Sequence, residues 1–234
     1  MAIILNIETS TEICSVSISE NGKCKFLKIH SPQPNDDEKY SHSKLLPVFI
    51  DDILKENGIK PEQIDAVAVS KGPGSYTGLR IGVSSAKGFA FGINKPLISI
   101  DTMLIMAKMA KSKIKNTFDF IVPMIDARRM EVFCSVFDRD LKQISPVIAK
   151  ILTSESFNEL KSDKVCFCGN GAEKSINLLK NDNFIFELNI IPSAELMCEL
   201  SEKKFIAEEF ENISSFEPYY LKDFVATTPK NKLI

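Results

Sequence analysis

The stretch KGPGSYTGLRIG, residues 71–82, is the most distinctive part of this sequence. It follows an apolar run, IDAVAVS at 64–70, that predicts a buried strand, and it leads into a helix predicted from about Thr77 to Gly92. A strand, a glycine-rich loop and a helix N-terminus in this order are typical of an anion-binding site. The loop–helix motif consists of Gly72, Pro73, Gly74, Ser75, Thr77 and Arg80.

Two known phosphate-binding motifs do not match this stretch. A Walker loop requires Lys and then Ser or Thr after its second Gly, whereas Gly78 is followed by Leu79 and Arg80. The G-P-G-S order also fails the dinucleotide-binding fingerprint. The plainer interpretation is a tight turn that starts a helix, with Ser75 or Thr77 as the N-cap.

The predicted helix over 77–92 is rich in small residues. Each interior Gly costs about 1 kcal/mol of helix stability relative to Ala, so retaining it indicates that something approaches closely. Gly78, Gly82 and Ala86 are spaced i, i+4, i+8 and form one smooth ridge. Such a ridge permits close contact with a partner helix. Packing of the same helix on its own sheet is an equally open interpretation.

The residues before this stretch predict three strands. The apolar run at 2–8 indicates a buried strand, and the pattern at 13–20 alternates as a half-buried strand does. Asn21-Gly22 then predicts a tight hairpin turn, from which residues 24–30 return antiparallel.

A helix is predicted over 43–57, after a polar loop at 31–41. Pro47 is tolerated in the first turn of a helix, which places the start close to position 43. Leu45 and Val48 widen the apolar stripe beyond what one core contact requires.

The helices over 43–57 and 77–92 are therefore our candidate partner surface. Side by side they would offer a flat apolar patch, and two such pairs would close as a four-helix bundle. The residues assigned to this surface are Leu45, Val48, Phe49, Asp52, Gly78, Leu79, Gly82, Val83, Ala86 and Phe89.

The loop between the first two strands offers a second candidate site. It contains Glu8, Thr9, Ser10 and Thr11, whose hydroxyl and backbone N–H groups could cradle a phosphate while a carboxylate holds Mg²⁺ through water. Without a Gly, however, the backbone cannot approach a phosphate closely. From these residues alone a polar turn is the favoured interpretation, and a vestigial phosphate loop is the alternative.

The rest of the chain repeats the pattern of strands and helices. Strands are predicted at 97–101, 119–128, 131–138, 146–152, 164–170 and 185–191, and helices at 102–112, 154–161, 172–179 and 193–208. The order predicts an α/β protein with mixed sheets in two related halves, 1–100 and 101–234. We expect the tail from about residue 214 to return to the first half.

The composition is that of a globular protein with a core: 234 residues, 44% apolar and 26% charged. The formal net charge of −2 disfavours unaided nucleic-acid binding, because neutralised phosphates supply most of that affinity. The N-terminus has no basic flank or cleavage site, and no apolar stretch approaches the roughly 20 residues of a membrane helix. We therefore expect a cytoplasmic protein.

The sequence gives little support to metal or nucleophile chemistry. The two histidines, His30 and His42, have no acidic ligand pair near them, and no Ser/His/Asp or Cys/His arrangement can be argued. The six cysteines have no zinc spacing, although Cys166 and Cys168 would point the same way from one strand. We expect six reduced, mostly buried thiols and no metal.

Several of these stretches together resemble one family. They are the ETST loop at 8–11, S-x-L-L-P at 43–47, KGPGSYTGLRIG, IDAR at 125–128 and CGNGA at 168–172. This combination is similar to the TsaB (YeaZ) family of the actin-like, Hsp70-like ATPase superfamily, which has an RNase H-like fold. The resemblance runs from the N-terminus to the PYYL segment at 218–221.

The resemblance implies an accessory subunit. Members of the family pair with a catalytic paralogue, TsaD, and with the ATPase TsaE, to transfer a threonylcarbamoyl group to adenosine 37 of tRNA. It further implies that tRNA is bound only through the complex and that no cofactor binds stably to the chain alone. It leaves two alternatives for the isolated chain, a homodimer and a monomer. A nucleotide at the interface of the complex is the one cofactor that the resemblance allows.

The chain departs from the catalytic paralogue at two places. That paralogue binds a metal through H-x-x-x-H, but here His42 is followed four residues later by Leu46, which cannot coordinate a metal. The Gly-Gly-Thr phosphate loop of active members is replaced by Asp126-Ala127-Arg128. An Asp–Arg pair that locks a turn is the plainer interpretation of the replacement.

Two other classes of function remain alternatives. One is a degenerate-site enzyme of the same superfamily, either a small-molecule kinase or a peptidase-like protein, which the lost phosphate loop and metal ligand disfavour. The other is a stand-alone RNA-binding module, which the net charge of −2 disfavours.

Overall fold

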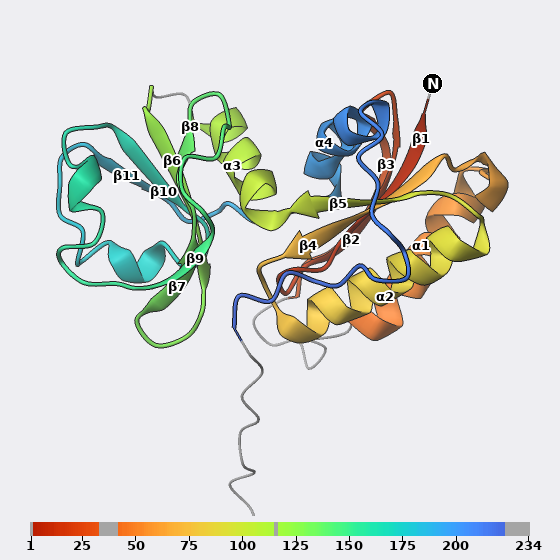
Figure 1. The fold of residues 1–234 in the computed structure, drawn as a ribbon, viewed down its shortest axis with the longest axis horizontal. Helices are drawn as coiled ribbons and strands as arrows, with labels where there is room; N and C mark the ends of the chain where they lie inside the picture. Colours follow the sequence, from red (N-terminus) through yellow and green to blue (C-terminus); the bar gives the residue numbers. More distant parts are fainter. Residues whose placement is uncertain (1, 33–41, 115–116, 223–234) are drawn as a thin grey trace, which may run out of the picture.

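Two mixed β-sheets organise residues 2–32, 42–114 and 117–222, which are the residues that the computed structural model describes. Each sheet belongs to one α/β lobe, and the chain crosses between the lobes at the end of β5 (Figure 1). The α/β fold expected from the sequence is confirmed. Part of the loop expected at 31–41 lies outside the described residues.

The first sheet has the order β3-β2-β1-β4-β5. Its strands are β1 (Ile3–Glu8), β2 (Cys14–Glu20), β3 (Lys23–His30), β4 (Ala66–Gly72) and β5 (Leu97–Asp101). β1 is antiparallel to β2 and parallel to β4. The expected hairpin turn is present, since Asn21 and Gly22 both have positive φ. The strands that the sequence predicted here are therefore confirmed.

Helices cover both faces of this sheet. α1 (His42–Glu56) and α2 (Tyr76–Gly92) lie side by side on one face, and α4 (Ala194–Ile206) lies on the other (Figure 1). Ser75 caps α2, because its side chain accepts a hydrogen bond from the backbone N–H of Gly78. Pro47 lies in the second turn of α1 rather than in the first, and it is exposed there, so water can reach the carbonyl that it leaves unpaired.

The face of the sheet beneath α4 is polar. Ser17 and Ser19 of β2 and Asn6 of β1 are fully buried there. Ser17 donates a hydrogen bond to the Ala194 carbonyl at 2.9 Å, and the Ser201 hydroxyl of α4 donates to the Asn6 side chain at 2.7 Å. Hydrogen bonds therefore fix α4 on this face of the sheet. On the opposite face, α1 and α2 rely on apolar packing.

The second sheet has the order β11-β10-β6-β7-β9, with β8 paired to β6. Its strands are β6 (Phe120–Asp126), β7 (Glu131–Cys134), β8 (Phe137–Asp138), β9 (Ile148–Ile151), β10 (Val165–Cys168) and β11 (Phe184–Glu187), and α3 (Thr102–Lys113) packs against it. The strand predicted at 131–138 is divided into β7 and β8. Elsewhere the predicted strands are present with shorter bounds.

Two helices predicted for this lobe are wrong. The segment 154–161 forms turns and one 3₁₀ turn, Asn158–Leu160, because Phe157 has a left-handed φ of 61° that interrupts a helix. The segment 172–179 also contains only a 3₁₀ turn, Glu173–Ser175. So short a segment forms too few α-type hydrogen bonds to favour a helix.

The expected division into 1–100 and 101–234 needs one correction. The crossover after Asp101 lies where it was expected, but α4 packs on β1, β2 and β5 of the first sheet. The return to the first lobe therefore begins with α4, well before residue 214. Beyond the helix, the Glu211 backbone N–H donates to the Leu97 carbonyl at 2.8 Å, and that of Tyr219 donates to the Lys71 carbonyl at 2.8 Å.

The small-residue ridge of α2 faces the interior of the protein. Added Cβ atoms would overlap the Thr9 carbonyl at Gly78 and the Thr9 hydroxyl at Gly82. Leu79, Val83 and Ala86 are also buried, with at most 3% exposed. These five residues therefore do not lie on an exposed partner surface, and the ridge serves packing on the first lobe. No helix within the described ranges is long and apolar enough to cross a membrane.

The ridge predicts opposite effects for two alanine substitutions in α2. Gly78→Ala should lower the free energy of unfolding by about 1–3 kcal/mol, the usual cost of overpacking, because the backbone of Thr9 cannot yield to the new Cβ. Gly88→Ala adds its Cβ in open space and should raise stability by up to about 1 kcal/mol. Urea unfolding of both variants measures the difference. Equal effects would show that the interior side of the ridge is not tightly packed.

Candidate functional site

A cleft of about 620 Å³ lies between the two lobes. The β1–β2 loop and the β4–α2 loop line it from the first lobe, and the turn after β6 lines it from the second. The sequence-predicted residues that line it are Ser10, Thr11, Gly74, Ser75, Thr77, Asp126 and Arg128. The structure thus brings together the two loops that the sequence selected as candidate phosphate sites.

The β1–β2 loop and the β4–α2 loop are in direct contact. The backbone N–H of Ser75 donates to the Ser10 carbonyl at 2.6 Å, and the Thr9 hydroxyl donates to the Gly78 carbonyl at 2.8 Å. A Cβ at Gly74 would overlap the Ser10 carbonyl, so glycine is required for this approach. The glycines of KGPGSYTG therefore let the β1–β2 loop pack directly against the β4–α2 loop. A phosphate-binding loop would instead leave this space open for an anion.

Three backbone donors of the β1–β2 loop are satisfied within the first lobe. The backbone N–H of Ser10 donates to Glu8 Oε1 at 2.6 Å, that of Thr9 donates to the Ser70 hydroxyl at 3.5 Å, and that of Ile13 donates to the Thr11 hydroxyl at 3.3 Å. Glu8 is fully buried. Its carboxylate thus takes the place that a bound anion would have in an open loop.

Burial determines the titration of this carboxyl group. Removal from water raises the pKa of Glu8 above its ordinary value, and hydrogen bonds from Ser10 and Ser70 offset part of the rise. A buried acid of this kind is a structural element of the loop, since its side chain does not line the cleft.

On the opposite side of the cleft, Asp126 locks a turn. Lys174 Nζ contacts Asp126 Oδ1 at 2.6 Å and also donates to the carbonyls of Arg129 and Glu131. Asp126 Oδ1 accepts a further bond at 2.6 Å from the backbone N–H of Arg128. The expected turn-locking role of Asp126 is correct, but its cationic partner is Lys174 and not the guanidinium group of Arg128.

His42 is a structural residue in the first lobe. It is buried, its Nε2 lies 3.2 Å from the Ile13 carbonyl, and burial lowers the pKa of its imidazole. Leu46, in the position of a second ligand, is in the core. Within residues 2–32, 42–114 and 117–222, no three His, Cys, Asp or Glu side chains are grouped as a metal site would require.

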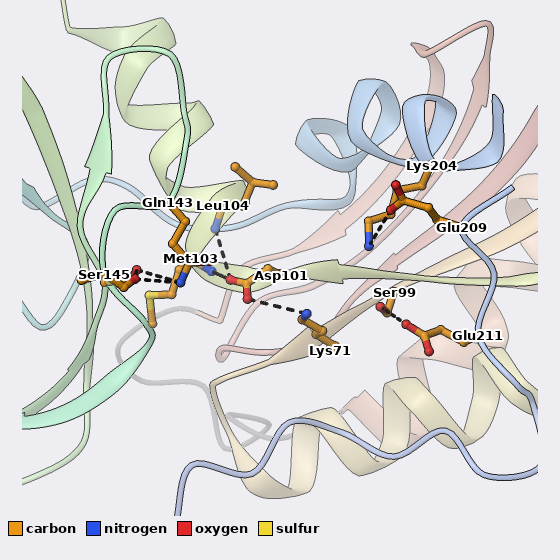
Figure 2. Close-up of polar contacts among 11 residues, drawn as sticks. Lys71, Ser99, Asp101, Met103, Leu104, Gln143, Ser145, Lys204, Glu209 and Glu211 are labelled. Carbon is orange, nitrogen blue, oxygen red and sulfur yellow. Dashed lines mark hydrogen bonds and ion pairs between the residues drawn. The ribbon is translucent and has the colours of Figure 1, made fainter. Parts of the chain in front are cut away.

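A second cavity, of about 390 Å³, lies at the crossover between the lobes. Figure 2 shows Lys71 and Asp101 facing each other there, with Nζ and Oδ2 3.9 Å apart. Asp101 Oδ1 also caps α3 by accepting from the backbone N–H of Met103 at 2.8 Å. Lys71 and Asp101 thus help to fix the path of the crossover, because they join the ends of β4 and β5 to the start of α3.

The solvent side of α1 and α2 carries an open apolar surface. Val48 is 50% exposed and Phe91 is 78% exposed. On α2, in the two turns before Phe91, Ser84 and Gly88 are exposed and small, and a Cβ at Gly88 would contact nothing within 4 Å. Of the remaining residues assigned to the partner surface, Leu45, Phe49, Asp52 and Phe89 are half-buried. We refer to Val48, Ser84, Gly88 and Phe91 as the open helix face.

Comparison with known proteins identifies the family. The protein from Haemophilus influenzae named tRNA threonylcarbamoyladenosine biosynthesis protein TsaB is 31% identical over 95% of this chain and 94% of its own length. The chain belongs to the TsaB family. The Escherichia coli K12 protein of the same name is 29% identical over 95% of this chain and 96% of its length. A family model described as "TsaD: tRNA N6-adenosine threonylcarbamoyltransferase" matches residues 36–229.

A solved structure shares the fold of this TsaB-family chain. The structure described as YeaZ from Pseudomonas aeruginosa superposes with a TM-score of 0.80, at 22% identity, over 94% of this chain and all of that one. The resemblance that the sequence motifs indicated is therefore confirmed, and so is the actin-like ATPase fold class.

Sequence reasoning missed three elements of the site. Lys174 gave no signal, because its partner Asp126 lies 48 residues away. The return of the C-terminal segment to the first half was expected, but its contacts with α2 were not: Lys87 Nζ donates to the Phe216 carbonyl at 2.8 Å, and the rings of Tyr76 and Tyr220 lie 5.0 Å apart. The exposed small residues of α2 have the same spacing as the buried ridge, so the sequence does not show which of the two lines faces solvent.

The buried Glu8 predicts a characteristic pH dependence of stability. Because its folded pKa is raised, the folded chain binds more protons than the unfolded chain. The stabilising contribution is full below the ordinary glutamate range and is lost as the pH rises toward the raised pKa. Glu8→Gln keeps an acceptor for Ser10 and removes the charge. The variant should therefore gain stability relative to the parent chain as the pH is raised from 4 toward 8.

Urea unfolding at several pH values measures this difference. Glu12→Gln is the matched control, because Glu12 is exposed in the same loop. A difference between Glu8→Gln and the parent chain that does not change with pH would contradict the account of a buried, charge-destabilised carboxyl group.

Proposed function

We propose that this TsaB-family chain acts in tRNA threonylcarbamoyladenosine biosynthesis as a non-catalytic subunit that pairs with a TsaD-like threonylcarbamoyltransferase. The names of its relatives support the pathway. The β1–β2 loop is the observation that carries the non-catalytic role: the N–H groups of Thr9, Ser10 and Ile13 are bonded to Ser70, Glu8 and Thr11, and its backbone is packed against Gly74 and Gly78.

Catalysis on a nucleotide would require the opposite arrangement. Phosphoryl chemistry depends on free backbone donors and cations directed at the transferred group. In this cleft the loop donors are used internally, and Lys174 is held by Asp126 and two carbonyl groups. The cleft thus keeps the position of an ATPase site with little of its chemistry, which supports a role carried out through contact with another chain.

The open helix face is our candidate for that contact. Val48 and Phe91 supply apolar area, while Ser84 and Gly88 let a second helix approach α2 closely. The sequence predicted a partner surface on the same two helices. We now assign its small residues to Ser84 and Gly88, because these are exposed whereas Gly78, Gly82 and Ala86 are buried. A partner with a matching helix pair would complete a four-helix bundle.

We extend the proposal to the other components. A TsaE-like ATPase would join the complex, tRNA would be held by the partner chains because this chain has a net charge of −2, and a nucleotide would bind only where the subunits meet. Without its partner, the chain would use the open helix face to form homodimers, since the same patch on two copies can pair around a two-fold axis.

A charge on the open helix face should weaken the partner complex. Val48→Glu leaves an unpaired carboxylate in the interface, and we expect at least about tenfold weaker binding to the TsaD-like paralogue. Co-purification and binding titration with the paralogue measure the effect. Formation of threonylcarbamoyladenosine by the reconstituted complex should fall in parallel.

The matched control is Ile151→Glu, because Ile151 is also exposed, at 68%, but lies on β9 of the second lobe. It should bind as the parent chain does. Gly88→Leu provides an uncharged test, since it blocks close helix approach at a position where the fold has space. Normal binding by folded Val48→Glu and Gly88→Leu would remove the open helix face from the proposal.

The isolated chain should turn over no ATP and should not bind tRNA. Backbone donors of the β1–β2 loop are bonded within the chain, which leaves few of them for a triphosphate. The net charge of −2 provides too few cationic groups to bind the RNA backbone. Phosphate release and a salt-dependent tRNA shift assay test the two statements. ATP hydrolysis that is lost in Asp126→Ala would instead show that the cleft is an active site.

A further inference from the structure

We propose that Cys24 and Cys198 form a reversible dithiol–disulfide pair, a modification site that links the β2–β3 hairpin to α4. The site lies on the polar face of the first sheet, apart from the cleft and from the open helix face. It is independent of the proposed function, because it rests only on how α4 packs on the sheet.

The strand register places Cys24 under α4. In the β2–β3 hairpin, Cys24 of β3 pairs directly with Ser19 of β2. Directly paired residues point to the same face of a sheet, and Ser19 is buried on the α4 face, where it accepts a hydrogen bond from Asn6. At the hairpin tip, Gly22 lies against Glu199 and Glu202 of α4. The Cys24 side chain therefore points toward the helix.

The helix places Cys198 at the same point. Its sulfur lies 3.4 Å from the Ser17 hydroxyl and 3.8 Å from Asn6 Nδ2, above the neighbouring positions of β1 and β2. Cys24 and Cys198 are also close enough for each to be the first cause of the shift in the other's pKa. Two cysteines that are far apart in sequence are thus neighbours in the fold, which is the first requirement for a disulfide.

The surroundings make Cys198 the more reactive sulfur. The nearby Cys24 thiol is the main cause that lowers the pKa of Cys198, to about 7, and the Ser17 and Ser19 hydroxyls and Lys108 add to it. The same contact raises the pKa of Cys24. A thiolate is the nucleophilic form of cysteine, so Cys198 would react first and Cys24 would resolve the product.

The edge of the sheet gives a small oxidant access. β3 is an outer strand, and Cys24 is half-buried while Cys198 is 2% exposed. With hydrogen peroxide, the Cys198 thiolate attacks one oxygen, and the O–O bond breaks to give a sulfenic acid and hydroxide, which takes up a proton. The Cys24 thiol then attacks the sulfenic sulfur, forming the S–S bond and releasing water. In sum, two thiols lose two electrons and two protons to one peroxide, which becomes two waters.

The chain contains its own control. Cys166 and Cys168 lie two residues apart on β10 and are both fully buried in the same core cluster, as their spacing predicted. They are closer in sequence than Cys24 and Cys198, but they have no exposed route for an oxidant. If proximity alone determined oxidation, these two would react as well.

Peptide mass spectrometry of the full chain tests the proposal. The reduced protein is treated with one equivalent of hydrogen peroxide, blocked with an alkylating reagent and digested without reductant. We expect a mass loss of two hydrogens, one cross-linked peptide pair that joins Cys24 to Cys198, and its disappearance on adding a thiol reductant. Cys166 and Cys168 should be recovered alkylated.

Variants distinguish the two roles. In Cys24→Ser the cross-link should be lost, and Cys198 should stop at a sulfenic acid that a dimedone probe traps. In Cys198→Ser the cross-link should be lost without such trapping at Cys24. A chain that stays fully reduced, a Cys166–Cys168 cross-link in its place, or over-oxidised Cys198 with no cross-link would each overturn the proposal. Circular dichroism of each variant confirms that it is folded. Cys24→Ala repeats the test with a smaller side chain at position 24.

Discussion

The contact between the β1–β2 loop and the start of α2 is the constraint on which the rest of the first lobe depends. Gly74 and Gly78 let the backbone of Ser10 and Thr9 approach, and the bond from Ser75 to Ser10 closes the contact. This approach sets the rotation of α2 about its own axis. The ridge of Gly78, Gly82 and Ala86 therefore faces inward, and Ser84 and Gly88 face solvent.

The same contact explains why three N–H donors of the β1–β2 loop are not available to the cleft. A loop that binds a phosphate directs its N–H groups outward, whereas this loop bonds to its own Glu8 and to Ser70. On the second lobe, Lys174 satisfies Asp126 and two carbonyl groups of the turn. The polar groups of both lobes therefore hold the loops in shape.

The sequence predicted the first lobe well, because its signals are local. Asn21-Gly22 specifies a hairpin turn and Ser75 caps α2 through contacts within a few residues. It could not decide which face of α2 meets the sheet, since small residues follow two lines of the same spacing. The role of Lys174 could not be predicted, because its contact with Asp126 spans 48 residues of the sequence. The helix expected at 154–161 failed because the left-handed backbone at Phe157 is set by its packing in the core.

The most direct test of the account is where the partner touches this chain. A photo-cross-linking amino acid placed at Ser84 on α2, or at Ile151 on β9, would be illuminated in the presence of the TsaD-like paralogue. The account predicts a cross-link to the partner from position 84 and none from position 151, with the attachment site on a helix of the partner. Cross-links from position 151 and none from position 84 would contradict it.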